Sequence, residues 1–319
     1  MLVVITVSVF LHLSNRFQRA TEQPPAPLPS SSPTPAPTTE QGMWTMNSIG
    51  RLGNQMGEYA LAKMNGHQVY IQREMYQQLA PLFCITLPIV SSDVVQRIPW
   101  RNYGLHDWMS EEYRYIKGKY IRLMGYPCSW TFDHHIRQEI LQEFSFHDHI
   151  KEEAKQYLAK LHGQRQKVTY VGVHVRRGDY VQVMPQTWKG VVADKAYLEK
   201  AMRYFRAKYQ VFLVTSNGME WCRENINASR GGCVFLGRWE RVVARQRFCS
   251  LGPLQPHRHD HRDLWHLGSY LAEGETVYLA NYTLPDSRLL QLFKPEAAFL
   301  PEWIGIDANL SPLLTGMSG

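Results

Sequence analysis

The fold of this chain is decided by the stretch VGVHVRRGDY, which runs from Val171 to Tyr180. The stretch from Lys167 to Val175 is short and rich in β-branched residues, with little alternation of apolar and polar side chains. This pattern predicts a buried strand. Two arginines, a glycine and an aspartate follow the strand at once. Because ligands bind at the carboxyl ends of strands in an open α/β sheet, the stretch predicts an α/β fold with a ligand site here.

Arg176 and Arg177 place two guanidinium groups at the end of the predicted strand. Such groups bind planar or tetrahedral anions through paired hydrogen bonds, and a diphosphate is the natural candidate. Gly178 allows a tight turn and a close approach of the backbone. The alternative is a surface turn in which the arginines pair with Asp179 and bind no ligand. The residue types alone leave both interpretations open.

The residues that follow predict a parallel β-α-β unit with a right-handed crossover. After a loop through Trp188 to Gly190, the expected elements are a helix over Lys195–Tyr209 capped by Asp194, a helix over Glu220–Glu224, and strands over Val211–Val214, Val234–Leu236 and Thr276–Ala280. Thr215, Ser216 and Asn217 lie where the first of these strands ends, and Asn281 where the last one ends. Side chains at these ends are placed to reach a ligand.

A similar strand, turn and helix open the first half of the chain. The expected strand covers Met43–Ile49, Gly50 and Gly53 form the turn, and a helix follows over Glu58–Met64. This order is that of the first unit of a Rossmann-like domain. Further along, Asp133–Leu161 predicts a pair of helices.

The stretch Arg101–Tyr126 is rich in aromatic residues, among them Trp108, Tyr113, Tyr115 and Tyr120. Flat aromatic faces suit stacking on a sugar, whereas packing in a core is their commoner role. Both interpretations stay open at this point.

The first residues indicate a membrane or export signal. Leu2–Leu13 is apolar and is followed by Arg16 and Arg19. It is short for a membrane-spanning helix, which needs roughly 17–25 residues, and has the length of the apolar region of a cleaved signal. The alternative is a buried amphipathic segment of the folded domain. Gln23–Gln41 consists largely of proline, serine, threonine and alanine, which predicts an extended stem without a core.

Several peptides of this chain resemble those of one enzyme family. HVRRGDY, His174 to Tyr180, resembles the nucleotide-sugar motif shared by α1,2- and α1,6-fucosyltransferases. A closer resemblance, to the galactoside α1,2-fucosyltransferases of the secretor and H type in glycosyltransferase family 11, is carried by GRLGNQMGEY at 50–59, the stretch 211–225, YLANYTLPD at 278–286 and FKPEAAFLPEW at 293–303. These peptides match in the right order over about 42–314, with one gap.

The resemblance implies a GT-B-like α/β fold in which two Rossmann-like domains face a cleft. The implied order is a signal anchor at 1–14, a stem at 15–42, an acceptor-side domain at 43–165 and a GDP-fucose-binding domain at 166–319. The implied reaction moves L-fucose from GDP-β-L-fucose to the 2-hydroxyl of a terminal β-galactose, with inversion. The implied location is the Golgi membrane, as a type II single-pass protein with luminal catalytic domains.

The resemblance also implies roles for single residues. Arg176 stabilises the β-phosphate, Arg177 holds the turn or shares the charge, and His174 and Asp179 orient the pair. Asp179 is a candidate general base, although a salt bridge to a neighbouring arginine explains it equally well. The substrate-contacting set also includes Gly178, Asn54, Gln55, Thr215, Ser216, Asn217, Asn281 and Asp286. No Asp-x-Asp occurs in the sequence, so we expect neither a metal nor a cofactor, with arginine stabilising the leaving GDP.

Composition agrees with a small anionic substrate. The 319 residues suffice for two domains, 44% are hydrophobic, and the net charge is +7. There is no arginine-rich helix, zinc-finger spacing or aromatic nucleic-acid motif, so we expect no nucleic acid as a partner. A basic protein instead attracts an anionic nucleotide sugar. The five cysteines form no CxxC motif and leave the redox compartment open.

The gap in the resemblance covers 237–268, where arginines and histidines gather without a helical pattern. His257, His259 and His261 alternate and could hold a metal on one face of a strand, or the stretch is a solvated basic loop. We favour a third explanation. His259 to Gly268 can be encoded as CAT GAC CAT CGG GAC CTT TGG CAT CTG GGC, and reading one base later gives MTIGTFGIW. That peptide stands at this place in the resembled family, so the stretch is interpreted as read out of frame.

This interpretation keeps two alternatives to an active enzyme. One is an impaired or inactive paralogue that binds glycan or a partner enzyme, and the other is a damaged product without stable function. The sequons at Asn227 and Asn309 are expected glycosylation sites in a secretory compartment, whereas the sequon at Asn281 lies at a strand end assigned to the site.

Overall fold

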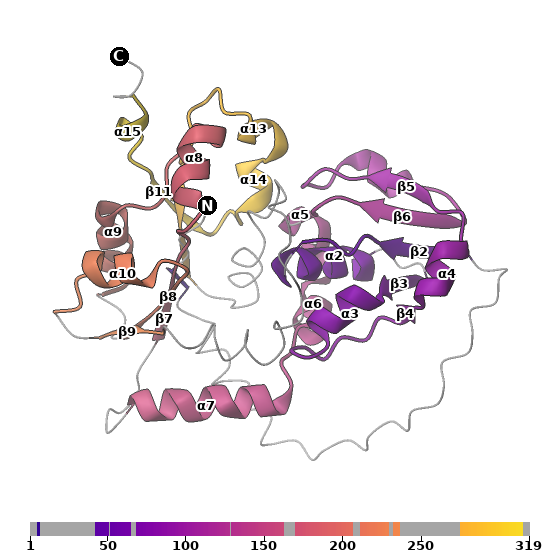
Figure 1. Ribbon diagram of the computed structural model, residues 1–319, viewed down its shortest axis with the longest axis horizontal. Helices are drawn as coiled ribbons and strands as arrows, with labels where there is room; N and C mark the ends of the chain where they lie inside the picture. Colours follow the sequence, from indigo (N-terminus) through magenta and orange to yellow (C-terminus); the bar gives the residue numbers. More distant parts are fainter. Residues whose placement is uncertain are drawn as a thin grey trace. The chain divides into compact units, whose positions relative to one another are not determined.

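The computed structural model describes residues 5–6, 42–50, 52–64, 68–127, 129–162, 170–206, 211–229, 232–236 and 275–314. The chain forms two compact units, one of residues 12–158 and one of residues 1–11 together with 159–319. Each unit contains a sheet with helices packed on it (Figure 1). The α/β class with parallel sheets is therefore confirmed, and the domain limits drawn from the sequence stay a prediction.

The unit of residues 12–158 is built on a parallel sheet with the strand order β4-β3-β2-β6-β5. Its strands are β2 (Met43–Met46), β3 (Val69–Gln72), β4 (Ile89–Val90), β5 (Arg101–Gly104) and β6 (Tyr120–Met124). Its helices are α2 (Leu52–Met64), α3 (Arg73–Leu79), α4 (Ser92–Arg97), α5 (Trp130–Asp133) and α6 (Arg137–Glu143), with 3-10 turns η1 (Glu111–Tyr115) and η2 (His134–Ile136). The boundary between the units falls within α7 (Asp148–His162).

The core of this unit lies between the sheet and α2. Every residue of β2 is buried, as expected for a central strand covered on both faces. Tyr59 of α2 is fully buried and packs its ring on Phe144, which in turn contacts Phe83. These contacts anchor α2 in the core of this unit.

A buried carboxylate also ties α2 to α6. Glu143 accepts hydrogen bonds from Tyr59, from Lys63 at 2.8 Å and from the Thr86 hydroxyl at 2.5 Å. Burial favours a higher pKa for Glu143, but the hydrogen bonds from Lys63, Thr86 and Tyr59 hold that pKa below its ordinary value. The ionised group fixes the orientation of α2 about its axis.

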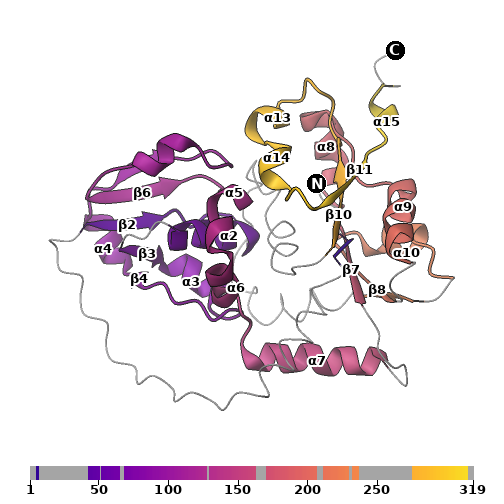
Figure 2. The same ribbon diagram turned by 180° about the vertical axis from the view of Figure 1, so that it is seen from behind.

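The second unit contains a sheet with the strand order β11-β10-β1-β7-β8-β9. Its strands are β1 (Ile5–Thr6), β7 (Tyr170–Val175), β8 (Val211–Ser216), β9 (Cys233–Phe235), β10 (Thr276–Ala280) and β11 (Ile304–Asp307). Its further helices are α8 (Tyr180–Trp188), α9 (Lys195–Arg206), α10 (Met219–Asn225), α13 (Leu289–Leu292), α14 (Pro295–Ala298) and α15 (Ser311–Leu314). Helix α9 packs against β10 and β11, and α10 against β8, and both views show α9 beside α10 (Figure 2).

Strand β1 differs from its neighbours in direction. It pairs antiparallel with both β7 and β10, whereas β7, β8 and β9 pair parallel and so do β10 and β11. The other five strands of this sheet therefore run the same way. The sequence predicts a signal anchor at 1–14, and that expectation stays a prediction. No described helix is both long enough and apolar enough to cross a membrane.

The predicted β-α-β unit is confirmed, since β7 and β8 pair parallel and α9 lies between them in sequence. The predicted cap is confirmed as well, because the Asp194 carboxylate accepts a hydrogen bond from the Tyr197 amide at 2.7 Å. The apolar stripe of α9 is buried, including Leu198, Met202 and Phe205. The stretches 167–169 and 207–210, at the ends of the expected strand and helix, lie outside the described residues.

Two local predictions were wrong. Helix α2 begins at Leu52 rather than near Glu58, so Gly53 lies in its first turn, and Gly50 makes the bend at a φ of +79°. The expected loop through Trp188 is instead helix α8 up to that residue, with Pro185 inside it, and the helix ends where Lys189 adopts a left-handed conformation. The anomalous stretch 237–268 lies outside the described residues.

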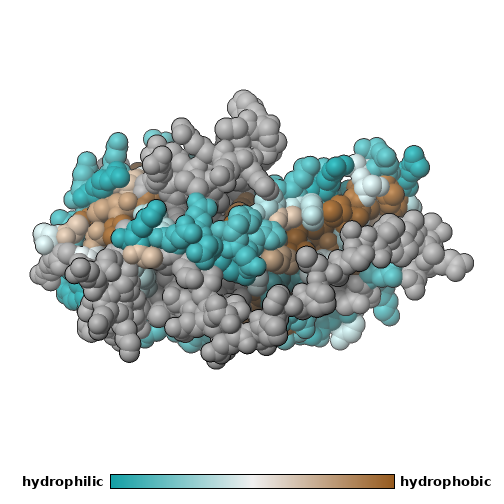
Figure 3. Space-filling model, turned by 90° about the horizontal axis from the view of Figure 1, so that it is seen from below, coloured by the Kyte–Doolittle hydropathy of each residue, from teal (hydrophilic) through white to brown (hydrophobic). Residues whose placement is uncertain are grey.

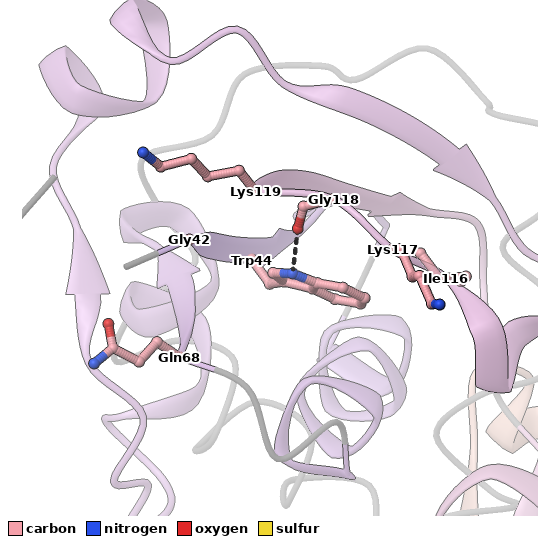
Figure 4. A pocket seen from close by; sticks show the side chains of 7 residues that line it. All are labelled: Gly42, Trp44, Gln68, Ile116, Lys117, Gly118 and Lys119. Carbon is pink, nitrogen blue, oxygen red and sulfur yellow. Dashed lines mark hydrogen bonds between the residues drawn. The ribbon is translucent and has the colours of Figure 1, made fainter. Parts of the chain in front are cut away.

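A pocket opens at the amino edge of the sheet in the unit of residues 12–158. It is lined by Gly42, Trp44, Gln68 and Ile116 to Lys119, and the Trp44 indole donates to the Gly118 carbonyl at 3.2 Å (Figure 4). Gly42 and Lys119 directly precede β2 and β6. The pocket therefore lies opposite the carboxyl ends, where α/β sheets bind ligands.

Hydrophobic and hydrophilic residues lie side by side on the surface drawn in Figure 3. Large apolar side chains such as Tyr115, with 68% of its surface exposed, and Leu314, with 55%, are exposed singly. Scattered exposure of this kind is ordinary in soluble domains.

Candidate functional site

The carboxyl ends of β7 and β8 bring most of the predicted site residues together. The parallel register pairs His174 with Thr215 and Val175 with Ser216. The buried His174 ring contacts the Thr215 hydroxyl through Nδ1 at 3.0 Å, and the Ser216 hydroxyl donates to the Val175 carbonyl at 2.7 Å. The arginine motif, His174 to Tyr180, and the residues Thr215 to Asn217 at the end of β8 therefore form one edge of the sheet, which we call the arginine edge.

Asn217 clamps the backbone at Arg177 from the neighbouring strand end. Its side-chain oxygen accepts from the Arg177 amide at 2.6 Å, and its side-chain nitrogen donates to the Arg177 carbonyl at 3.2 Å. Gly178 next to it has a φ of +64°, and a Cβ there would lie 2.6 Å from the Asn217 amide nitrogen. The turn thus requires glycine at 178, and it fixes where both arginines begin.

Arg177 lies on an aromatic ring. Its guanidinium carbon is 3.9 Å from the centroid of the Trp221 ring, and its Nη1 donates to the Ala193 carbonyl at 3.4 Å. Burial lowers the pKa of Arg177. Cation–π contact with indole stabilises such a partly desolvated guanidinium.

Arg176 has different surroundings. Its Nη2 donates to the Asp179 carboxylate at 2.7 Å, and its guanidinium lies 4.7 Å from the centroid of the Tyr180 ring. A guanidinium carries five N–H donors. In the described part of the chain no further hydrogen bond occupies the Arg176 side chain, so it keeps donors for an anion. The pairing of Arg176 with Asp179, which the sequence offered as an alternative, is present. It occupies one donor and leaves the others able to bind an anion.

His174 contributes no charge to this edge. Burial, and then the positive charge of Arg176, depress the pKa of His174 well below its usual range. The imidazole is therefore neutral near pH 7. It serves as a buried hydrogen-bonding group under the arginine turn.

Asn281 and Asp286 lie after β10 in the same unit, but protein partners hold their side chains. Asn281, with a φ of +47°, donates to the Asp307 carboxylate at 2.7 Å. Asp286 pairs with Lys189 at the end of α8, and this contact lowers the pKa of the carboxyl. Backbone hydrogen bonds from Val191 to Tyr282 and from Leu284 to Lys189 join the same two segments. Their predicted contact with substrate stays a prediction.

Asn54 and Gln55 lie in the other unit, in the first turn of α2, so the described contacts do not join them to the arginine motif. The Gln55 amide donates to the Ile49 carbonyl and accepts from the Ser48 hydroxyl, both at 2.8 Å. Asn54 is buried against Gly50. Both side chains support the turn between β2 and α2.

Two residues of the arginine edge were missed by reasoning from sequence. Tyr180 stands four residues after Arg176, but Arg176 precedes α8, so the rule for residues four apart in a helix does not predict their contact. Trp221 lies 44 positions from Arg177 in sequence on a separate helix, so only the register of β7 and β8 reveals the contact.

The predicted glycosylation sites are exposed. Asn227 accepts hydrogen bonds from the amide and hydroxyl of Ser229, and Asn309 accepts one from the Ser311 amide. Their modification stays a prediction. The metal site considered at His257, His259 and His261 lies outside the described residues.

An arginine pair at the carboxyl end of a strand in an α/β sheet is an arrangement typical of proteins that bind phosphorylated ligands. The chain belongs to the glycosyltransferase class, in glycosyl transferase family 11, whose profile matches residues 6–307. It is similar to galactoside alpha-(1,2)-fucosyltransferase 2 of Sus scrofa, with 55% identity over 98% of this chain and 95% of that protein. The proteins of the same name from Bos taurus and Mus musculus are 54% and 53% identical over 98% of the chain, covering 95% and 94% of their own lengths. No solved structure matches the chain.

Proposed function

We propose that this protein is a galactoside α1,2-fucosyltransferase. It takes L-fucose from GDP-β-L-fucose and transfers it to the 2-hydroxyl of a terminal β-galactose on glycoproteins and glycolipids. The observation that carries the proposal is Arg176, which stands at the carboxyl end of β7 with guanidinium donors to spare, in a chain similar over 98% of its length to α1,2-fucosyltransferases.

The proposed reaction is a single inverting displacement. The galactose 2-oxygen attacks C1 of fucose, the bond between C1 and the diphosphate oxygen breaks with its electron pair on GDP, and a base takes the hydroxyl proton. Arg176 stabilises the charge that develops on the β-phosphate, because donors aimed at developing charge act most strongly in the transition state. A metal ion is not part of this scheme.

The other residues of the arginine edge have supporting roles in this proposal. Arg177, Asn217 and Gly178 set the turn, while Thr215, Ser216 and neutral His174 line the strand ends beneath it. Asp179 is the candidate base, although its contact with Arg176 at 2.7 Å also fits a role in orienting that guanidinium. Asn281 and Asp286 complete the set after β10.

The GT-B-like arrangement belongs to the same proposal, with the donor held by the second unit and the acceptor by the unit of residues 12–158. So does the location, a type II protein of the Golgi membrane with its catalytic domains in the lumen. The apolar stretch Leu2–Leu13 and the proline-rich stretch Gln23–Gln41 support this location.

The test is incubation of the full chain with GDP-fucose and N-acetyllactosamine, followed by mass spectrometry and linkage analysis of the product. We expect one fucose per acceptor, and no product from the 2-O-methyl galactoside, which lacks the acceptor hydroxyl. Transfer to the 2-O-methyl compound would overturn the linkage. Absence of any product would overturn the activity.

A second function is favoured by the stretch 237–268, which departs from the family peptide MTIGTFGIW. In this alternative the chain binds acceptor glycan or a partner enzyme without turnover. Binding of β-galactosides on a glycan array, together with absent transfer, would support it.

A further inference from the structure

The carboxyl edge of the sheet in the unit of residues 12–158 is held together by hydrogen bonds. The Leu105 amide donates to the Met124 carbonyl at 2.8 Å, and the Gly125 amide donates to the Asn47 side chain at 3.1 Å. Asn47 in turn donates to Glu58 of α2 at 2.9 Å. The ends of β5, β6 and β2 are thus joined at the edge where an α/β sheet binds its ligands.

Two aromatic rings are stacked at this edge. His106 and Trp108 follow the last residue of β5 by two and four positions, and their ring centroids lie 4.9 Å apart at an interplanar angle of 9°. His106 is exposed and Trp108 is half-buried. Because the two parallel rings lie one over the other, the pair presents the outer face of the exposed His106 ring, backed by the Trp108 indole, beside the turn that contains Asn47.

Buried residues hold the loop that carries these rings. The His106 amide donates to the Tyr113 hydroxyl at 2.6 Å, and the Met109 amide donates to the Thr131 hydroxyl at 2.9 Å. Tyr113 is buried and stacks on the buried ring of Phe132 at 6.4 Å and 10°. A surface braced in this way loses little freedom on binding, which favours affinity.

We propose that His106 and Trp108 form the acceptor platform of this protein, on which the galactose ring of a β-galactoside stacks. The proposal rests on the proposed function and deepens it by naming where the acceptor binds. The axial 4-hydroxyl of galactose leaves a continuous patch of C–H groups on the opposite face of the ring. That patch is apolar and flat, and it matches the outer face of the His106 ring in the stacked pair.

Tyr115 provides a matched control, since it is an aromatic residue of the same region without this setting. Its ring is 68% exposed, and its hydroxyl contacts Glu111 at 3.5 Å. It lies in η1, beyond the braced loop. Tyr115 and His106 are therefore both exposed. They differ because only His106 belongs to the stacked pair on the supported loop.

The experiment compares the full-length Trp108→Ala, Trp108→Phe, His106→Ala and Tyr115→Ala variants with the unaltered chain. The measurements are the KM values for N-acetyllactosamine and for GDP-fucose, and saturation-transfer NMR of N-acetyllactosamine. We expect Trp108→Ala, which removes the ring that backs His106, to raise the acceptor KM roughly 3- to 10-fold and to weaken the galactoside signal. The GDP-fucose KM and the protection by GDP against thermal unfolding stay unchanged, Trp108→Phe recovers most of the loss, and Tyr115→Ala matches the unaltered chain.

An acceptor KM for Trp108→Ala equal to that of Tyr115→Ala would overturn the platform while leaving the fucosyltransferase function in place. Conversely, a galactoside NMR signal that depends on Trp108 in a chain that transfers no fucose would support the platform and overturn the function. If Trp108→Ala lowers the unfolding temperature, His106→Ala decides, because it removes an exposed ring. An unchanged galactoside signal in a folded His106→Ala protein would then overturn the platform.

Discussion

The guanidinium of Arg177 rests on the Trp221 ring at 3.9 Å, whereas that of its neighbour Arg176 is paired with Asp179 at the turn. The two arginines are therefore not equivalent. Arg177 is held by an indole, a carbonyl and a backbone clamp, so its charge is fixed in place. Among the described residues only Asp179 accepts a hydrogen bond from the Arg176 side chain, and we propose that its other donors bind a diphosphate whose attraction the field of Arg177 strengthens.

We predict that Trp221 is a positioning residue for Arg177. Trp221→Leu removes the cation–π contact, so GDP affinity should fall roughly 3- to 10-fold. The KM for GDP-fucose should rise by a larger factor than kcat falls. Trp221→Phe should restore most of it. Isothermal titration with GDP provides the measurement.

The control for this experiment is Trp100→Leu. Trp100 lies under Arg122 at 5.4 Å in the other unit, so the variant removes a comparable contact away from the arginine motif. Equal GDP affinities of Trp221→Leu and Trp100→Leu would show that the indole does not set the site.

In any active form of this protein, Arg176→Lys should abolish most fucosyl transfer. A lysine keeps the charge but cannot reproduce the paired hydrogen bonds of a guanidinium. Loss of one contact to developing charge is expected to lower kcat/KM roughly 100-fold. Arg114→Lys is the matched control, because Arg114 pairs with Glu111 at 3.1 Å with the same three-residue spacing. A drop of less than a few-fold in Arg176→Lys would remove this residue from the site.

The arginine edge shows what a sequence can and cannot reveal. Strands β7 and β8 were predictable because their residues are apolar, β-branched and buried on both faces. Strand β5 was not, since its residues Arg101 to Gly104 are mostly exposed and carry no alternation. The contact of Arg177 with Trp221 depends on strand register, which local patterns do not encode.

The aromatic stretch illustrates the same limit. Tyr113 is buried, so core packing was the right interpretation for that residue, whereas the exposed ring of His106 carries no signal in the sequence. Helix α8 was predicted as a loop, and it forms although Pro185 inside it removes an amide donor.

Asp133 should make the protein less stable as the pH rises. Burial raises the pKa of Asp133 to about 7, against about 3.9 in an unfolded chain. Below about pH 4 the carboxyl is protonated in both states and costs nothing. Between about pH 4 and 7 the unfolded chain releases its proton first, so the folded state loses stability, up to about 4 kcal/mol in all. Asp133→Asn should therefore raise the unfolding temperature at pH 7.5 and hardly change it at pH 4.

Thermal unfolding followed by circular dichroism between pH 4 and 8 measures this effect. Asp148→Asn is the control, because Asp148 is exposed and its hydrogen bond with Lys151 lowers the pKa of that carboxyl. That variant should show no gain at pH 7.5. Unfolding curves for Asp133→Asn and the unaltered chain that shift in parallel with pH would contradict the assignment.

The N-terminal segment has two placements that exclude each other. Ile5 and Thr6 pair with β7 and β10 in the sheet, while the apolar stretch Leu2–Leu13 predicts a membrane anchor. We predict the anchor. In expressing cells the full chain should stay in the pellet after carbonate extraction, with its catalytic domains protected from protease. Deletion of 1–14 should release a protein with an unchanged unfolding temperature. A soluble full chain, together with a destabilised deletion, would assign these residues to the sheet instead.

The last prediction concerns the stretch 237–268, which stands between β9 and β10 in sequence. Its arginines and histidines replace the apolar and small residues of MTIGTFGIW. A buried, unpaired charge costs several kcal/mol, against a total stability of about 5–15 kcal/mol, so these side chains cannot complete a core. In the described part of the sheet, the place between β7 and β10 is filled by the two residues of β1, which run against all the others. Because we predict that residues 1–14 form an anchor instead, this place becomes open to a parallel strand from a repaired segment.

Replacing 237–268 with the reading one base later, so that MTIGTFGIW precedes Tyr270, should therefore raise fucosyl transfer and restore protection by GDP against unfolding. The unaltered chain should show weak transfer and be cut by protease within this stretch. Both proteins are compared at equal concentration, and the repaired protein carrying Arg176→Lys serves as the control that ties the recovered activity to the arginine site. Strong transfer by the unaltered chain, or no gain on repair, would contradict the out-of-frame interpretation. Stoichiometric zinc bound through His257, His259 and His261 would establish the metal site in its place.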